Sequence, residues 1–376
     1  MGGVVDSPTE NTLEVTLIGT GGGYGESSVI HLGNNEWVVV DSCHDPISKE
    51  SLPLKYLTEI GVDVANCVKL VICTHWHDDH ILGLPKLLEA CGEDVQFYFA
   101  PCTDREKFLA LLEIDAGKSL DNLNSSSTKE FYNSMLILSR KGILPRRAMM
   151  DRLIYRIKTE KIVGNIYTLS PSDLAMQKFD NEIGSMIEII KQRNRKLVNI
   201  SPNARSIVTY IHVNNHKILL GADLEIAQDL REGWDDIFNS STTLDEGISL
   251  FKIPHHGSIN GYYLPLWNSR IIEANVATMT PWNRGRMLPK IEMLEKYATH
   301  SKSIYLTSDV TTLGGKPKSR EASLTRLIRE KNPTVREIKF KHGIIRNRID
   351  IDATDNIWKT DLFGDAIHVN SKILSQ

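Results

Sequence analysis

Residues 68–80 read Val-Lys-Leu-Val-Ile-Cys-Thr-His-Trp-His-Asp-Asp-His, an apolar run followed closely by three histidines and two aspartates. The run is typical of a buried strand, so the polar residues are expected on the loop at its end. His75 and His77 are expected to aim at one point, and Asp79 and His80 at another nearby. One tetrahedral ion cannot easily use all four, whereas two ions about 3.5–4 Å apart can. The spacing therefore predicts a binuclear metal centre and disfavours a solvated loop that merely happens to be rich in histidine.

Three other apolar runs end in a residue that can bind a metal or support a ligand. They end at Asp41, at Asp223 and at the pair His255-His256. Catalytic groups gather at strand ends because the sheet supplies rigidity and the loops supply access. Taken alone, Asp41 could instead start a turn, and His255 could be a strand-end histidine bonded to a backbone carbonyl.

The His-x-His-x-Asp-His pattern and these strand-end residues resemble those of the metallo-β-lactamase fold hydrolases. The resemblance implies an α/β chain folded as an αββα sandwich, with residues 1–376 in a single domain. It also implies that Asp223 bridges two metals, that Asp41 orients a ligand histidine, and that the cofactors are two divalent ions, zinc or manganese. The implied metal ligands are His75, His77, Asp79, His80, Asp223 and His256.

The second histidine of the pair fits the family's last motif better than the first. Relatives with one histidine here tend to read His, a small residue and Ser, and His256-Gly257-Ser258 matches that order. His255 would then lie beside the metals, where it could contact a phosphate oxygen or protonate a leaving group.

The third family motif departs from the usual pattern. Many members have a histidine just before the strand that precedes the bridging aspartate, but residues 201–210 contain none, and His212 is expected inside the strand. Asn203 stands in this region as a weak ligand or a substrate contact. An Asn and a Ser here, followed by Gly-x-Asp and His-His-Gly-Ser, resemble the branch that contains the nuclease domain of DNA-uptake competence proteins. The expected catalytic residues are Asp79, His255 and Asn203.

The N-terminal segment agrees with that branch. Residues 13–18 alternate as a strand, residues 19–28 form a glycine-rich loop, and residues 29–32 return as the partner strand. The glycine spacing matches neither the dinucleotide-binding motif nor the phosphate-loop motif, and a strand follows where those motifs need a helix. We therefore expect no nucleotide cofactor. The glycines either let the backbone approach the metal pocket or simply form a hairpin.

Residues 103 to about 200 are expected to form a helical, basic insertion, with helices at 104–112, 128–140, 148–157 and 173–191. Residues 140–196 contain thirteen Lys or Arg against six Asp or Glu, a net charge of +7 in a chain whose total is −3. Such asymmetry favours a cationic surface over the metal cleft and a polyanionic substrate such as DNA or RNA. The alternative is an ordinary solvated helix face.

Composition sets wider limits on this protein. A chain of 376 residues with 41% hydrophobic and 24% charged content can bury one large core and carry an insertion. No apolar run reaches the eighteen or so residues of a membrane span, and the first residues are polar, so we expect neither a membrane segment nor a signal peptide. The five cysteines form no C-x-x-C pair and leave an odd one, which favours the reducing cytoplasm.

Two bound metals predict hydrolysis, because they lower the pKa of a bridging water from 15.7 to about 7 and so supply a hydroxide nucleophile. The motifs and the basic segment favour a phosphodiesterase or nuclease. A hydrolase of a small ester, lactone, thioester or cyclic nucleotide would use the same metals. A third alternative is a subunit of a larger assembly, such as an antiphage defence complex, with weak or no catalysis. Protein partners or self-association are compatible with each.

Overall fold

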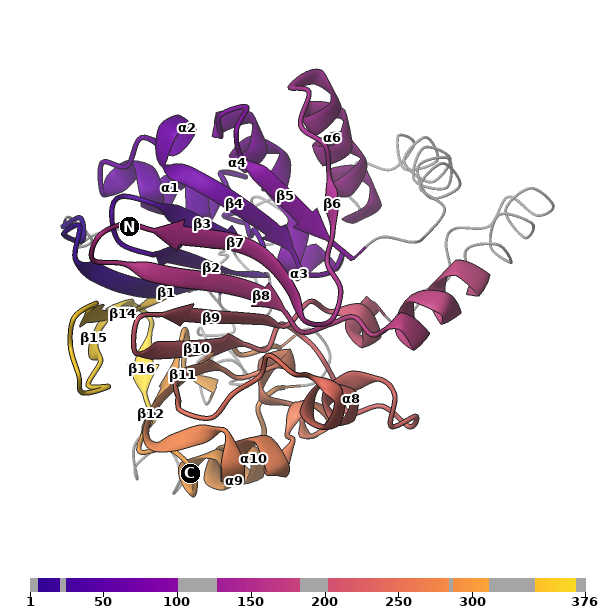
Figure 1. Cartoon of the computed structure of the whole chain (residues 1–376), viewed down its shortest axis with the longest axis vertical. Helices are drawn as coiled ribbons and strands as arrows, with labels where there is room; N and C mark the ends of the chain where they lie inside the picture. The colour runs from indigo at the N-terminus through magenta and orange to yellow at the C-terminus, as the bar shows by residue number, and fades with distance from the viewer. Residues whose placement is uncertain are drawn as a thin grey trace, which may run out of the picture.

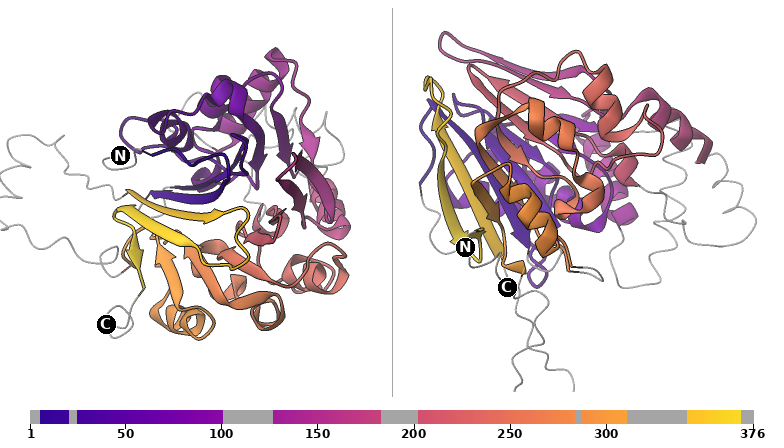
Figure 2. Two further views of the ribbon diagram at one scale, coloured as in Figure 1. Left: turned by 60° about the vertical axis from the view of Figure 1, so that its left-hand side comes forward. Right: turned by 90° about the horizontal axis from the view of Figure 1, so that it is seen from below.

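The computed structural model describes residues 6–20, 25–100, 127–182, 202–283, 287–310 and 342–369. Two eight-stranded sheets pack face to face, and helices cover the outer face of each (Figure 1, Figure 2). The expected αββα sandwich is confirmed. No helix within the described ranges is long and apolar enough to cross a membrane.

The first sheet has the strand order β15-β14-β1-β2-β3-β4-β5-β6. Its strands are β1 (Thr12–Thr20), β2 (Gly25–His31), β3 (Trp37–Val40), β4 (Val68–Cys73), β5 (Gln96–Phe99), β6 (Arg146–Arg147), β14 (His342–Asp350) and β15 (Lys359–Gly364). The second sheet has the order β16-β13-β12-β11-β10-β9-β8-β7. Its strands are β7 (Arg152–Lys158), β8 (Val163–Thr168), β9 (Thr209–Val213), β10 (His216–Leu220), β11 (Ile248–Lys252), β12 (Ile271–Met279), β13 (Ser303–Leu306) and β16 (Ile367–His368).

Helices lie on both outer faces of the sandwich (Figure 1). The first sheet is covered by α1 (Leu52–Glu59), α2 (Val64–Cys67), α4 (Leu84–Ala90) and α6 (Ser127–Arg140), and the second by α8 (Gly233–Ser240), α9 (Leu264–Ser269) and α10 (Ile291–Ala298). The short helices at the site are α3 (Asp78–Ile81), η1 (Pro202–Arg205), η2 (His255–Gly257) and η3 (Ile259–Gly261). Residues 173–182 are also helical.

The central strands of both sheets are buried on two faces, which explains their nearly continuous apolar runs. One cluster of buried side chains fills the space between the sheets, and one more lies under the helices on each side. Strands β3, β4 and β5 run parallel to one another, as do β10, β11 and β12. The carboxyl ends of parallel strands meet at one edge of a sheet, so the loops after these strands gather there.

The helix expected at 148–157 is wrong, because residues 152–157 belong to strand β7 and residues 148–151 are not helical. Ile154 and Ile157 are both buried, and their spacing of three imitates a helix. The pairing of β7 with β8 shifts register between Leu153 and Tyr155. A bulge of this kind inserts one extra residue, so side chains three apart reach the same face. The expected basic insertion therefore includes β6, at the edge of the first sheet, and β7 and β8, in the second.

The remaining predicted helices and the predicted glycine-rich loop agree with the structure only in part. The helix at 128–140 is confirmed by α6, and residues 173–182 of the helix expected at 173–191 are helical, with Ser172 Oγ accepting a hydrogen bond from the Ala175 backbone. The helix at 104–112 and residues 183–191 lie outside the described residues. The expected loop at 19–28 is too long, since β1 continues to Thr20 and β2 begins at Gly25. Antiparallel pairing of β1 with β2 extends both strands into the glycine-rich segment.

Candidate metal centre

The histidine loop begins where β4 ends and is held there by Asp41, the residue after β3. The Asp41 carboxylate accepts hydrogen bonds from the backbone N–H and the hydroxyl of Thr74, each at 2.7 Å. Because β3 and β4 are parallel neighbours, this contact ties together the two loops that follow them. Helix α3 then starts at Asp78 and turns Asp79 and His80 inward, where both are buried.

Six side chains from three segments of the chain meet at this edge of the sandwich. The ligand atoms of Asp79, His80, Asp223 and His256 lie within 4.8 Å of one another, and so do those of His75, His77 and Asp223. All are buried except His77, which is partly exposed. Asp223 belongs to both groups, so it is the residue that could bridge two ions.

Both oxygens of the Asp223 carboxylate face ligand histidines, and Oδ2 lies near one histidine of each group. Its Oδ1 lies 3.3 Å from His80 Nε2, and its Oδ2 lies 3.8 Å from His75 Nε2 and 3.6 Å from His256 Nε2. In the second group, His75 Nε2 and His77 Nδ1 are 3.2 Å apart. Ring nitrogens and carboxylate oxygens converging in this way are the donor set that zinc and related ions take in proteins.

Hydrogen bonds on the far side of each ring fix which nitrogen faces the cluster. His80 Nδ1 donates to Asp41 Oδ2 at 2.7 Å, and His256 Nδ1 donates to the Thr280 carbonyl at 2.9 Å. Thr74 already donates its hydroxyl proton to Asp41, so at 3.0 Å it accepts one from His75 Nδ1. Each Nε2 therefore presents a lone pair toward the cluster, the arrangement found in metal-binding histidines.

Two buried atoms test whether a cation fits this site. Among the described residues, His80 Nε2 and Asp223 Oδ1 have no hydrogen-bond partner although both are buried. They face each other at 3.3 Å, where a lone pair and a carboxylate repel unless a positive charge lies between them. The donor set and these two atoms together fit a bound divalent ion.

Without metal, a proton supplies that positive charge. Burial lowers the pKa of His256, but the Asp223 and Asp79 carboxylates outweigh it and raise the pKa to about 9. The pKa of His80 is raised well above its usual value for the same reason, against the effect of burial. By contrast, burial and the neighbouring His80 and His77 keep the pKa of His75 well below its usual value. A metal must therefore displace protons from His80 and His256.

The predicted residues His255 and Asn203 lie together with a third residue, Glu225, which the sequence analysis did not single out. His255 Nδ1 lies 2.7 Å from Glu225 Oε1, and His255 Nε2 lies 3.3 Å from Asn203 Nδ2. His255 and His256 both have positive φ angles, 48° and 54°. Left-handed backbone at two consecutive histidines is strained, and such strain is typical of functional sites. The position of Glu225 two residues after Asp223 was the available signal.

Strand β2 approaches the centre closely at Gly25. A Cβ atom on Gly25, whose φ is +147°, would lie 2.5 Å from Cys43 Cβ and 3.0 Å from the Asp79 carbonyl. This favours the close-approach explanation of the glycine-rich segment over a plain hairpin. The next residue, Glu26, forms a buried ion pair with Lys252 beside the cluster, and neither residue was expected at the site.

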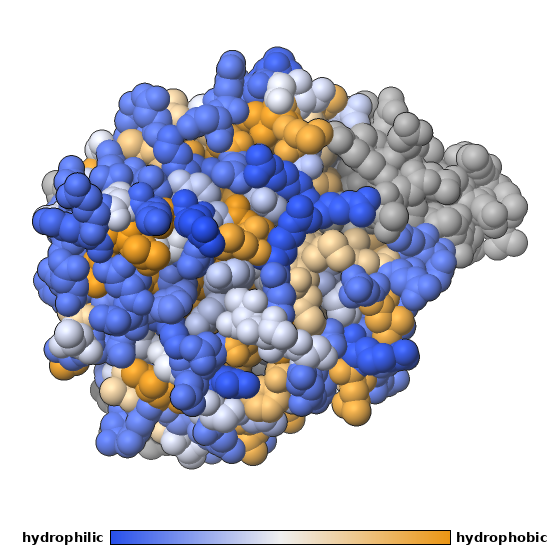
Figure 3. Space-filling model, viewed as in Figure 1, coloured by the Kyte–Doolittle hydropathy of each residue, from blue (hydrophilic) through white to orange (hydrophobic). Residues whose placement is uncertain are grey.

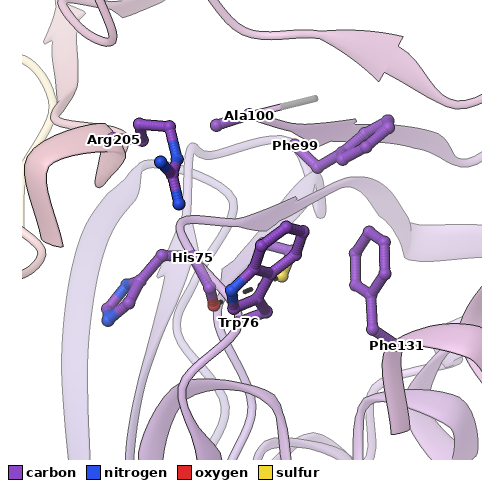
Figure 4. A pocket seen from close by; sticks show the side chains of 7 residues that line it. His75, Trp76, Phe99, Ala100, Phe131 and Arg205 are labelled. Atoms are coloured by element: carbon purple, nitrogen blue, oxygen red, sulfur yellow. Dashed lines mark hydrogen bonds between the residues drawn. The ribbon is translucent and has the colours of Figure 1, made fainter. Parts of the chain in front are cut away.

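A small aromatic pocket borders the cluster at His75 (Figure 4). The indole of Trp76 stands between His75 and Phe131, and Arg205 lies above it. The pocket has space for about one water molecule.

The comparisons with known proteins bear on the fold. Residues 20–95 match the family model described as the metallo-beta-lactamase superfamily. Among solved structures, the chain is similar to MEM-A1, a subclass B3 metallo-beta-lactamase isolated from a soil metagenome library (12% identity, 68% of this chain and 84% of that one covered, TM-score 0.32). It is also similar to the hydrolase AbOPH in the beta lactamase superfamily (10% identity, 60% and 76% covered, TM-score 0.33). A search of curated proteins found no match.

The matched segment contains Asp41 and the whole histidine loop. On this match and on the two sheets flanked by helices, the chain has the metallo-β-lactamase fold.

Proposed function

We propose that this metallo-β-lactamase fold protein is a binuclear metal-dependent phosphodiesterase or nuclease of the kind found in the competence-protein branch. The observation that carries the metal part is the sharing of Asp223 between two groups of convergent ligand atoms. His75, His77 and Asp223 would hold one ion, and Asp79, His80, Asp223 and His256 the other. Two divalent ions there would supply an activated water and Lewis acidity.

Residues of the chain itself would protonate the leaving group. Glu225 accepts the Nδ1 proton of His255 and so directs Nε2 away from itself, toward Asn203. An imidazole held in this way can donate a proton to a leaving oxygen, with the carboxylate stabilising the charged ring. Asn203 Oδ1 is buried without a hydrogen-bond partner among the described residues, so it is free to accept one from a substrate or a water.

A polyanionic substrate is favoured by exposed cations at the strands that border the site. Arg146, Arg147 and Arg152 are exposed on β6 and β7. The molecular face over β7 and β8 is mostly hydrophilic, with small separate hydrophobic patches (Figure 3). A surface of this kind suits the solvated backbone of a nucleic acid better than an apolar small molecule.

Not every cation of the basic segment is available to a substrate. Arg140 pairs with Glu89, and Lys178 pairs with Glu232. Lys141 donates to three backbone carbonyls at the end of α4 and just beyond it. The expected positions at 191–196 lie outside the described residues. The substrate part of the proposal rests on the exposure of the arginines of β6 and β7, of which Arg146 also donates to Gln96 Oε1 at 2.6 Å.

The test is hydrolysis of single- and double-stranded DNA, RNA and a model phosphodiester, each with manganese or zinc. The matched control is the His80→Ala/Asp223→Ala double variant, which should bind neither ion and hydrolyse nothing. Esters, lactones and thioesters form a parallel panel. Rapid cleavage of that panel with every phosphodiester left intact would replace this proposal with a small-molecule hydrolase. Full metal occupancy in the double variant would overturn the ligand assignment.

A further inference from the structure

An ion pair connects the two sheets directly beneath the candidate metal centre. Glu26 lies on β2 of the first sheet, and Lys252 ends β11 of the second. The two side chains are only 3% and 5% exposed, and they are in direct contact. Charged side chains this deeply buried are rare unless a specific interaction requires them.

Both members of the pair contact groups of the metal centre. Lys252 Nζ donates to the Ala222 carbonyl at 2.9 Å and lies 4.0 Å from Asp223 Oδ1. Glu26 Oε1 lies 3.8 Å from His80 Nε2. The ammonium group therefore borders the residue shared by both ligand groups, and the carboxylate borders a ligand of only one.

The Lys252 ammonium group and the Glu26 carboxylate are in direct contact where water is excluded, so each charge compensates the other. Lys252 is thus a fixed cation facing the same carboxylate that two divalent ions would share. Glu26 Oε2 is buried and has no hydrogen-bond partner among the described residues, so one oxygen of this carboxylate also remains uncompensated.

We propose that Glu26 and Lys252 are positioning residues that set the metal affinity of the centre through their opposite charges. Lys252 repels divalent ions and holds Asp223 in place, while Glu26 attracts the ions and neutralises Lys252. Unit charges about 4 Å apart interact strongly where water is excluded. The inference rests on the metal centre of the proposed function and not on its substrate.

The two charges predict shifts of opposite sign. Glu26→Gln removes a negative charge and leaves Lys252 uncompensated, so the dissociation constant for Mn²⁺ or Zn²⁺ should rise about tenfold or more. Lys252→Met removes the repelling charge, so the dissociation constant should fall about tenfold or more. The double variant Glu26→Gln/Lys252→Met restores neutrality and should lie within about threefold of the wild-type value.

The measurement is competition with a chromophoric chelator, with the melting temperature of metal-free protein as a check on folding. The control is Lys217→Met on the neighbouring strand β10, which removes the ion pair between Lys217 and Asp245 and should leave metal affinity unchanged. A purely structural pair would lower stability in both single variants and shift affinity in the same direction, which would overturn the inference. If the Lys252→Met variant does not fold, an unchanged metal affinity in the Glu26→Gln variant would likewise overturn the inference. Wild-type protein that binds no divalent ion would overturn the proposed function as well.

Discussion

Asp41 Oδ2 accepts a hydrogen bond of 2.7 Å from Nδ1 of His80, and both side chains are buried. This contact places the proton of the ring on the far side of the metal cluster and leaves Nε2 to face Asp223. Asp41 also anchors Thr74, and through it the start of the histidine loop. One carboxylate thus orients two elements of the site without belonging to either ligand group.

Asp41→Asn should weaken metal binding while preserving the fold. The amide can still accept a hydrogen bond but loses the negative charge that supports His80, and the loss of such a partner typically costs 10–100-fold in metal affinity. Metal retention during titration with a chelator measures the effect. Asp45→Asn is a suitable control, because Asp45 follows Asp41 closely but pairs with His342. Equal retention in the Asp41 variant and the wild type would mean that Asp41 does not orient a ligand.

Metal affinity should rise steeply with pH. The pKa of His256 in the metal-free protein is raised to about 9, so below that pH the metal must displace a proton from this residue. Dissociation constants measured from pH 6 to 9 should therefore fall with increasing pH. A flat profile over this range would contradict the protonated state of the empty centre.

The same pKa determines how the stability of metal-free protein varies with pH. A folded-state pKa above the unfolded value of 6.5 contributes stability that is fully present below pH 6.5 and is lost as the pH rises through about 9. Melting temperatures of metal-free protein should thus decline between these values. His256→Gln protein should decline less, because it lacks this group. If the melting temperatures of the two proteins change equally with pH, the pKa of His256 is not raised.

The rate of hydrolysis should depend on Glu225 and His255 only when the leaving group is poor. A leaving alkoxide needs a proton, whereas a nitrophenolate does not. Glu225→Gln and His255→Ala should therefore slow cleavage of a dinucleotide about 100-fold and change nitrophenyl phosphodiester hydrolysis by only a few fold. Metal content measured in parallel distinguishes this role from ligand binding. Equal losses on both substrates would mean that the two residues support the fold or the metals instead.

Binding of a nucleic acid should depend strongly on salt through the arginines of β6 and β7. Each phosphate neutralised by Lys or Arg releases counterions and contributes about 0.7 to the salt slope on a single strand, so replacing Arg146, Arg147 and Arg152 with Ala should lower that slope by up to about two. Affinity for single-stranded DNA between 50 and 200 mM salt, a range in which such contacts are resolved, gives the slope. A control variant replaces three exposed lysines elsewhere, Lys290, Lys302 and Lys359. If the salt dependence of DNA affinity has the same slope in both variants, β6 and β7 do not contact the substrate.

Much of the fold and of the metal cluster could be read from local patterns. Apolar runs that end in His, Asp or His-His mark strand ends, and parallel strands bring such ends to one edge. That is why Asp41, Asp223 and the pair His255-His256 could be placed beside the histidine loop although they are far apart in the chain, and the family resemblance then singled out His256. The errors also had local causes, since the bulge in β7 gave a helical spacing and the glycines before Glu26 resembled a long loop.

The residues that escaped prediction are those whose partners lie in distant segments. Glu26 and Lys252 meet because two sheets stack with β2 facing the end of β11, and Glu225 meets His255 because β10 and β11 are neighbours. Periodicity reports which face of a strand is buried, and motif spacing reports which donors share a loop. Neither the periodicity nor the motif spacing gives the distance between the two sheets or identifies the side chains that occupy the space between them. A buried charge finds its partner only after the sheets have packed, because burial itself creates the need for that partner.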